Sequence, residues 1–288
     1  MTGTLRFLVL DGYSRAGRDD LATGGASTAG KLYERMLKSA YDKAEVDILY
    51  PADPDATLPH GAGIGDYDGI AWTGSSLTVY HDTPEVKAQI DFQREVFSAG
   101  VPSFGSCWAA QIAVVAAGGH CAAHPHGREM FVARKIALTP EGRGHPLYRD
   151  KKTVFDAWIS HDDEITHLPH GAVLLAANDY TDVQALSVTH DRGTFWALQY
   201  HPEYDVHEMA RLIYCRKQKL TNLGFFADMD TAQGFVDMLE ALHQDPTRKD
   251  LAFQLGLDAD IMDPNIRTRE VRNWIEQLVV PTAARRHG

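Results

Sequence analysis

The chain has 288 residues, of which 44% are hydrophobic and 23% are charged, which is ordinary for a soluble protein with one large domain, or one domain and an appendage. Its formal net charge is −11, and its basic residues cluster only at Arg285-Arg286, which argues against nucleic-acid binding. No stretch is apolar enough to span a bilayer, and the N-terminal strand pattern shows no signal-peptide cleavage site, so we expect a cytoplasmic protein without membrane contact.

The first 100 residues alternate the patterns of strands and helices. Apolar runs predict buried strands over residues 5–10, 44–49 and 68–73, and amphipathic spacing predicts helices over 31–40 and 84–99. We expect the segment between the first strand and the first helix to be a mobile surface loop, because its glycines lack the spacing of a phosphate-binding loop. This alternation predicts an α/β fold with a parallel, doubly wound sheet.

The stretch from Val101 to Gly119 reads as a strand, a sharp turn and a helix. Cys107 stands at the turn. A nucleophile on such an elbow is lifted clear of the sheet, and the backbone N–H groups beside it belong to a helix N-terminus, where developing negative charge is stabilised. Cys107 is therefore the first candidate for catalysis.

The second half of the chain changes character twice. Five apolar runs from about Met130 to Tyr200 follow one another without helices between them, which predicts antiparallel strands. After Tyr204, polar and apolar residues alternate at helical spacing. We predict a catalytic domain over residues 1–205 and a helical extension, packed on that domain, over 206–288.

A base for Cys107 must come from elsewhere, because its immediate neighbours carry no ionisable side chain. His201 is the best placed of the 14 histidines, since it directly follows an apolar strand pattern. Glu203, two residues later, can orient the imidazole, which completes a Cys-His-Glu triad.

Four motifs in this order resemble the class I, or triad, glutamine amidotransferases. They are GIAWTGSS (69–76), GSCWAAQ (105–111), WISHDDEITHLP (158–169) and YHPE (200–203). The third resembles a segment in the ammonia-supplying domain of GMP synthase. The resemblance implies a flavodoxin-like three-layer core with a mostly parallel sheet, and the helices after residue 205 have no counterpart in it.

The resemblance also implies a mechanism and a set of site residues. Cys107 attacks the δ-carbonyl of a γ-glutamyl amide, His201 transfers protons and Glu203 fixes the imidazole. A γ-glutamyl thioester forms and water releases glutamate. The resemblance implies that backbone N–H groups hold the oxyanion, and it assigns this role to Gly74, Ser75 and Trp108. It also implies that three side chains border the amino-acid end of the substrate, namely Gln111, His161 and Asp163.

The elbow departs from the family motif at two positions. Ala109 stands where the motif has glycine, and Ala110 where histidine is common. We expect these changes to alter the shape of the pocket and to leave the nucleophile intact.

The remaining cysteines and a cluster of histidines are not assigned to the chemistry. Cys121 and Cys215 are expected to be small buried hydrophobes, and three unpaired cysteines indicate neither a disulfide framework nor a zinc site. His120, His124 and His126 are expected to lie in a loop, because they lack the spacing of a structural zinc site. We expect no metal and no cofactor.

Three functions stay open. The first is a glutaminase that passes ammonia to a separate synthase partner. The second is a free-standing hydrolase of γ-glutamyl amines or peptides. A non-catalytic binding protein is the third, and the intact triad argues against it. The sequence leaves homo-oligomerisation undecided.

Overall fold

The computed structural model describes residues 3–287. Its strands are β1 (Leu5–Leu10), β2 (Ala44–Leu49), β3 (Gly69–Trp72), β4 (Ser103–Ser106), β5 (His120–Ala123), β6 (Glu129–Leu138), β7 (Val154–His161), β8 (Asp163–His167), β9 (Ala172–Ala177), β10 (Ala185–His190) and β11 (Gly193–Leu198). Within the described range, nine strands form one sheet in the order β2-β1-β3-β4-β11-β10-β9-β6-β7, and β5 pairs with β8.

The helices are α1 (Arg15–Thr23), α2 (Ala29–Ala40), α3 (Pro84–Ala99), α4 (Trp108–Ala116), α5 (Pro140–Gly144), α6 (Val206–Asn222), α7 (Met229–Gln244), α8 (Lys249–Leu255), α9 (Ala259–Met262), α10 (Pro264–Arg267), α11 (Arg269–Trp274) and α12 (Val280–His287). Short 3-10 turns occur at η1 (Pro59–Gly61), η2 (Ile64–Asp66) and η3 (Pro146–Tyr148), and the π-helical η4 (Ile275–Val279) joins α11 to α12. Over residues 3–287, no helix combines the length and apolar character needed to cross a membrane.

The parallel part of the sheet consists of β2, β1, β3, β4 and β11, which is the 2-1-3-4-5 order of flavodoxin-like folds. The strands from β11 to β7 continue the sheet with antiparallel pairing. The predicted flavodoxin-like α/β class, with its parallel first half and antiparallel second half, is confirmed. In such sheets, ligands bind beyond the carboxyl ends of the parallel strands.

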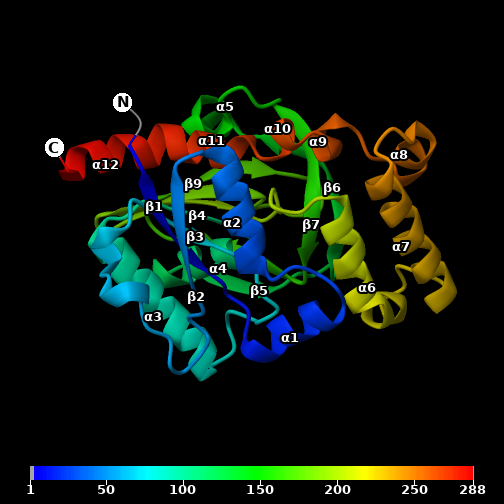
Figure 1. Cartoon of the computed structure of the whole chain (residues 1–288), viewed down its shortest axis with the longest axis horizontal. Coiled ribbons are helices and arrows are strands. Elements are labelled where there is room, and N and C mark those ends of the chain that lie inside the picture. The colour runs from blue at the N-terminus through cyan, green and yellow to red at the C-terminus, as the bar shows by residue number, and fades with distance from the viewer. Residues whose placement is uncertain (1–2, 288) are drawn as a thin grey trace.

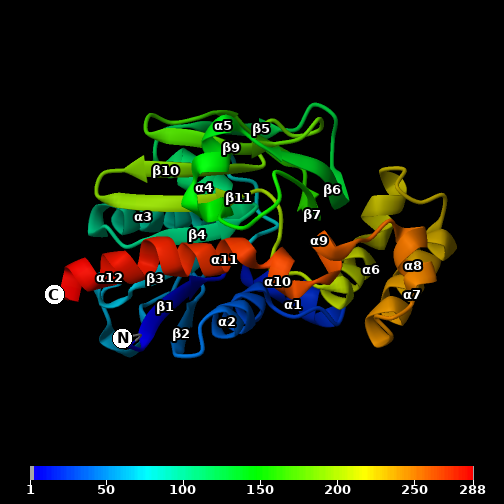
Figure 2. The ribbon, with the colours of Figure 1, turned by 90° about the horizontal axis from the view of Figure 1, so that it is seen from above.

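The central strands are buried on both faces, as their apolar runs predict. Phe7 and Val9 of β1 join the core beneath α2 and α11, whereas Leu8 and Leu10 join the core beneath α3 and α4. Trp274 of α11 packs on the first of these faces, with its ring centroid 5.7 Å from that of Phe7. Figures 1 and 2 show α11 and α12 running along the sheet, with α12 near the start of β1.

The C-terminal helices are confirmed, and they divide into two groups. Helices α6 to α8 gather at one end of the molecule, and α9 to α12 return along the sheet (Figure 1). The predicted domain boundary after residue 205 stays a prediction.

Two local predictions were wrong. The segment expected to be a mobile loop contains α1, whose N-cap Ser14 accepts a hydrogen bond from the Gly17 N–H. The segment of His120 and Cys121, expected to be a loop, forms the short strand β5 against β8. Both elements are short, so tertiary contacts outweigh their weak local signals.

Candidate active site

Cys107 lies at the elbow between β4 and α4, as predicted. Its φ of 56° and ψ of −105° place a non-glycine residue in a strained turn conformation. The Cys107 N–H donates a hydrogen bond of 2.7 Å to the Leu198 carbonyl at the end of β11, which holds the turn in place. The thiol is thereby presented at the carboxyl end of the sheet.

His201 and Glu203, three and five residues beyond the end of β11, form a buried pair. The His201 Nδ1 lies 2.7 Å from Glu203 Oε1, and both side chains are 2% exposed. Burial lowers the pKa of His201, but the charge and the hydrogen bond of Glu203, together with the nearby Cys107 thiol, outweigh it and raise the pKa to about 9. The imidazole therefore stands between the thiol and the carboxylate, as a triad requires.

A second layer of hydrogen bonds fixes this pair. Ser106 Oγ donates to Glu203 Oε1 at 2.9 Å, and the Tyr33 hydroxyl lies 2.6 Å from Ser106 Oγ. Burial and the charge of Glu203 raise the pKa of Tyr33 well above its ordinary value, so the phenol stays a donor. Tyr204 stacks on the His201 ring, with centroids 4.3 Å apart and planes within 14°.

The structure brings the three predicted oxyanion residues to the thiol. A Cβ built on Gly74 would lie 3.1 Å from His201 Cε1 and 3.9 Å from Cys107 Cβ, so only glycine fits comfortably at this approach. Ser75 turns its hydroxyl toward the backbone, where it donates to the Gly12 carbonyl at 2.8 Å. Trp108 begins α4, where a backbone N–H has no acceptor within the helix.

The alanine that replaces the motif glycine is accommodated by its neighbour on β4. Ala109 is fully buried, and a Cβ built on Gly105 would lie 2.4 Å from Ala109 Cβ. Because Gly105 carries no side chain, the extra methyl group fits between α4 and the sheet. The substitution therefore need not displace the elbow.

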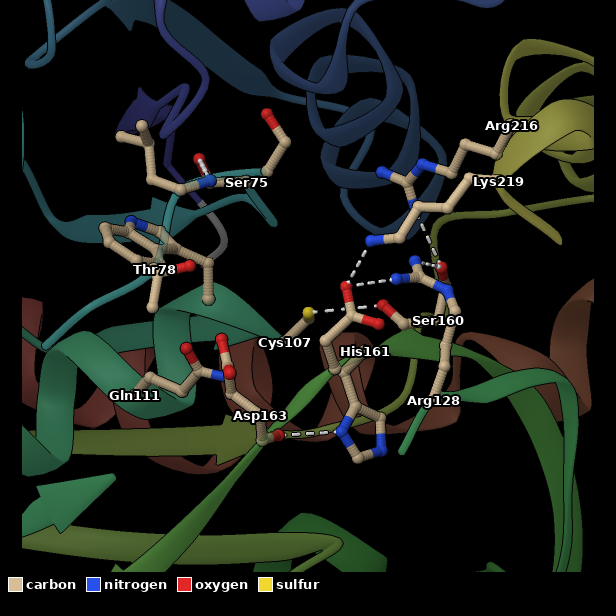
Figure 3. A pocket seen from close by; sticks show the side chains of 14 residues that line it. Ser75, Thr78, Cys107, Gln111, Arg128, Ser160, His161, Asp163, Arg216 and Lys219 are labelled. Carbon is tan, nitrogen blue, oxygen red and sulfur yellow. Dashed lines mark hydrogen bonds and ion pairs between the residues drawn. The ribbon is translucent and has the colours of Figure 1, made fainter. Parts of the chain in front are cut away.

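A cavity of about 220 Å³ opens beside the thiol. Gln111 and Asp163 lie on one side of Cys107 in this cavity (Figure 3). The Tyr80 hydroxyl donates to Asp163 Oδ1 at 2.7 Å, and burial raises the pKa of Asp163. This is the side on which the resemblance places the amino-acid end of the substrate.

His161 also lines the cavity, but its ring is fully engaged. Nδ1 lies 2.8 Å from the Asp163 carbonyl and Nε2 lies 2.9 Å from Glu129 Oε2. Both partners are acceptors when Glu129 is ionised. Burial raises the pKa of Glu129, but the hydrogen bond from His161 helps to hold that pKa below its ordinary value. His161 is therefore suited to positioning Asp163 rather than to contacting substrate.

Three cations that the sequence interpretation missed line the opposite side of the cavity. They are Arg128, at the start of β6, and Arg216 and Lys219 on α6. Arg128 and Arg216 both donate to Ser160 Oγ at 2.8 Å. Single basic residues on an amphipathic helix carry no local signal, so only the packing of α6 against the site reveals them.

The histidine cluster around β5 shows no metal arrangement. His124 Nε2 lies 2.8 Å from the Tyr180 carbonyl, and the rings of the two residues stack. Over residues 3–287, no grouping of three or more His, Cys, Asp or Glu side chains is placed to hold a metal ion.

A flavodoxin-like sheet with an elbow cysteine beside a His-Glu pair is the arrangement expected of a thiol-dependent amide hydrolase. The family model for Glutamine amidotransferase class-I matches residues 30–216, more than half of the chain. The chain belongs to this family, and it is an enzyme.

Relatives of known name extend the comparison. The chain is 35% identical to a gamma-glutamyl-L-1-hydroxyisopropylamide hydrolase from a Pseudomonas species, over 99% of this chain and 96% of that protein. It is 27% identical to the GMP synthase of Thermomicrobium roseum, over 91% of this chain but 46% of the synthase. A glutamine amidotransferase structure from Thermotoga maritima has the same fold, with a TM-score of 0.67, 15% identity and coverage of 96% and 99% of the two chains.

Proposed function

We propose that this chain is a free-standing hydrolase that cleaves the γ-glutamyl amides of organic amines. The observation that carries the proposal is the arrangement of Cys107, His201 and Glu203 at the wall of a cavity with Gln111 and Asp163 beyond the thiol. An acidic side chain and an amide at that end suit the ammonium and carboxylate groups of a glutamyl substrate.

The first half of the reaction is acyl transfer to the thiol. His201 Nε2 takes the proton of Cys107, and the thiolate attacks the δ-carbonyl carbon of the substrate. Backbone N–H groups of Trp108 and of Gly74 or Ser75 stabilise the oxyanion. The imidazolium then gives its proton to the leaving nitrogen, the C–N bond breaks, and the free amine departs from a γ-glutamyl thioester.

The second half is hydrolysis of the thioester. A water molecule gives a proton to His201 Nε2 and attacks the same carbonyl carbon. The tetrahedral intermediate collapses, the C–S bond breaks, and glutamate is released as the thiol regains its proton. Glu203 keeps the ring in the required tautomer through both halves.

The lengths of the relatives support hydrolysis without a partner. The hydrolase relative is matched over 96% of its length, whereas the chain spans less than half of the synthase relative. More than half of the synthase relative therefore lies outside the matched region. Ammonia supply to a separate synthase is the second candidate, which the GMP synthase relatives favour.

A substrate panel with the purified chain tests the proposal. We expect glutamate release from γ-glutamyl-L-1-hydroxyisopropylamide and other secondary γ-glutamyl amides without added protein, at a kcat/KM above that for glutamine. The liberated amine should appear in equal amount. Turnover of glutamine alone, and only after a synthase is added, would support the ammonia supplier and reject the free-standing hydrolase.

The activity should fall in alkaline solution, with a midpoint near pH 9 in the kcat/KM profile. Burial lowers the pKa of His201, whereas Glu203 and the nearby Cys107 raise it, to about 9 in total. Rising pH therefore removes the proton that the imidazolium must give to the leaving nitrogen. Replacing Glu203 with Gln removes a charge that raises this pKa, so the alkaline limb should move to lower pH by about one unit or more. An unmoved limb in Glu203→Gln would show that another group controls it.

A further inference from the structure

The three cations beside the thiol outnumber the carboxylates that form ion pairs with them in the described residues. Asp162 Oδ2 pairs with both Arg128 and Lys219, at 2.7 Å from the latter's Nζ. Arg216 makes no ion pair in the part of the chain that the structure describes. Its guanidinium donates to Ser160 Oγ at 2.8 Å and to the Tyr13 hydroxyl at 3.4 Å. Both of these acceptors are neutral. This side of the cavity therefore carries an excess of positive charge.

Asp162 forms its ion pairs with Arg128 and Lys219, and in the described residues it forms none with Arg216. Burial opposes its ionisation, but Arg128 and Lys219 together hold the pKa of Asp162 below its ordinary value. The carboxylate is thus in direct contact with those two cations and not with Arg216. A guanidinium in a half-buried wall without a carboxylate suits an anionic ligand, because charge-assisted hydrogen bonds to carboxylate are strong and directional.

The position of the cation-lined side of the cavity indicates which half of the substrate it contacts. Arg216 and Lys219 lie across Cys107 from Gln111 and Asp163 (Figure 3). If the glutamyl chain extends toward Gln111, the amine that leaves must extend the other way. His201 must also protonate the leaving nitrogen, and its stacking partner Tyr204 belongs to the same buried cluster as Tyr13, the residue that Arg216 contacts.

A second cavity extends this side of the site. It has a volume of about 520 Å³, lies between α1 and α6, and is lined by Tyr13, Leu21 and Tyr214 among others. Ser76 and Arg216 line both cavities, so they mark the junction. A substituent on the leaving amine can pass this junction with room beyond it.

We propose that the preferred substrate is a γ-glutamyl amide whose amine half carries a carboxylate, as in a γ-glutamyl amino acid, and that Arg216 binds that carboxylate at the junction of the two cavities. This inference rests on the proposed γ-glutamyl hydrolysis and specifies its substrate class. Arg216 acts as a specificity residue, and Lys219 reinforces the positive charge beside it.

Two substrates that differ at one position provide the test. γ-Glutamyl-L-alanine has a carboxylate where γ-glutamyl-L-1-hydroxyisopropylamide has a hydroxymethyl group. We expect kcat/KM to favour the alanine compound in the wild-type enzyme, and Arg216→Gln to reduce this preference by about 10- to 100-fold, the range for loss of a charged hydrogen bond. Arg216→Lys should retain part of the preference, because the charge remains.

Arg211→Gln is the matched control. Arg211 lies on the same helix and pairs with Glu240 at 3.3 Å, so the substitution removes an equal charge elsewhere on α6. Its preference between the two substrates should equal that of the wild type. The ratio of two kcat/KM values on one preparation is insensitive to the fraction of folded enzyme.

The outcomes separate this inference from the function on which it rests. Hydrolysis of both substrates without preference for the carboxylate in the wild type, or with a preference that Arg216→Gln leaves unchanged, would overturn the role of Arg216 and leave γ-glutamyl hydrolysis standing. Failure to hydrolyse any γ-glutamyl compound would overturn the proposed function, and this inference with it.

Discussion

Replacing Cys107 with alanine is expected to lower kcat for γ-glutamyl amides by at least about 10⁴-fold, because the substitution removes the atom that forms the thioester. The neighbouring Ser106 cannot substitute, since its hydroxyl is directed to Glu203 at 2.9 Å. Only stabilisation of the oxyanion by the backbone N–H groups and binding of the substrate would remain. Glutamate release from a secondary γ-glutamyl amide measures the effect.

Cys121→Ala is the control for this substitution. Cys121 lies on β5, half-buried among apolar residues, and burial raises the pKa of its thiol to about 12. Its removal should leave kcat within about twofold, since surface and peripheral changes are usually mild. A thiol-directed glutamine analogue should add its mass to wild type and Cys121→Ala but not to Cys107→Ala. Full activity in Cys107→Ala would reject the covalent mechanism.

The residues proposed as nucleophile, base and orienting carboxylate could be singled out from the sequence because each is next to a strong local pattern. Cys107 interrupts a strand-to-helix transition, and His201 follows an apolar strand. The structure explains why two such distant residues meet: β4 and β11 pair in parallel, with Ser106 opposite Leu198. Strand order and register are properties of the whole sheet, so the sequence predicts the residues and the fold supplies their contact.

The cation-lined side of the cavity, formed by Arg128, Arg216 and Lys219, was not predictable in the same way. Arg216 and Lys219 are three residues apart on α6, as exposed basic residues on many helices are. Their role depends on how α6 packs against Ser160 and Tyr13, which come from β7 and the loop after β1. Likewise, α1 lacks a strong apolar pattern, and contacts with α6 secure it. In both cases, long-range packing decides what the local sequence leaves open.

The C-terminal segment is joined to the loop after β11 by a buried network. Glu270 on α11 is fully buried and pairs with Lys151 Nζ at 2.8 Å. The Tyr200 hydroxyl donates to Glu270 Oε1 at 2.6 Å, and it lies 2.9 Å from the Tyr148 hydroxyl. Tyr200 directly precedes His201, so this network ties α11 to the segment that carries the proposed catalytic base.

Glu270→Ala is therefore expected to lower the free energy of unfolding by about 3–5 kcal/mol, because it leaves the ammonium of Lys151 buried without its carboxylate. Chemical denaturation followed by circular dichroism measures the change. Glu276→Ala, an exposed position six residues later on η4, should change stability by less than about 0.5 kcal/mol.

A double variant distinguishes the ion pair from simple loss of packing. Lys151→Met with Glu270→Leu removes both charges while retaining apolar volume, so it should recover much of the stability that Glu270→Ala loses. The Tyr200 hydroxyl would still lose its acceptor, which sets a limit to the recovery. If the double variant were less stable than Glu270→Ala, the charge on Lys151 would not be the cause, and the loss would have to come from the Tyr200 hydrogen bond that holds the segment before His201.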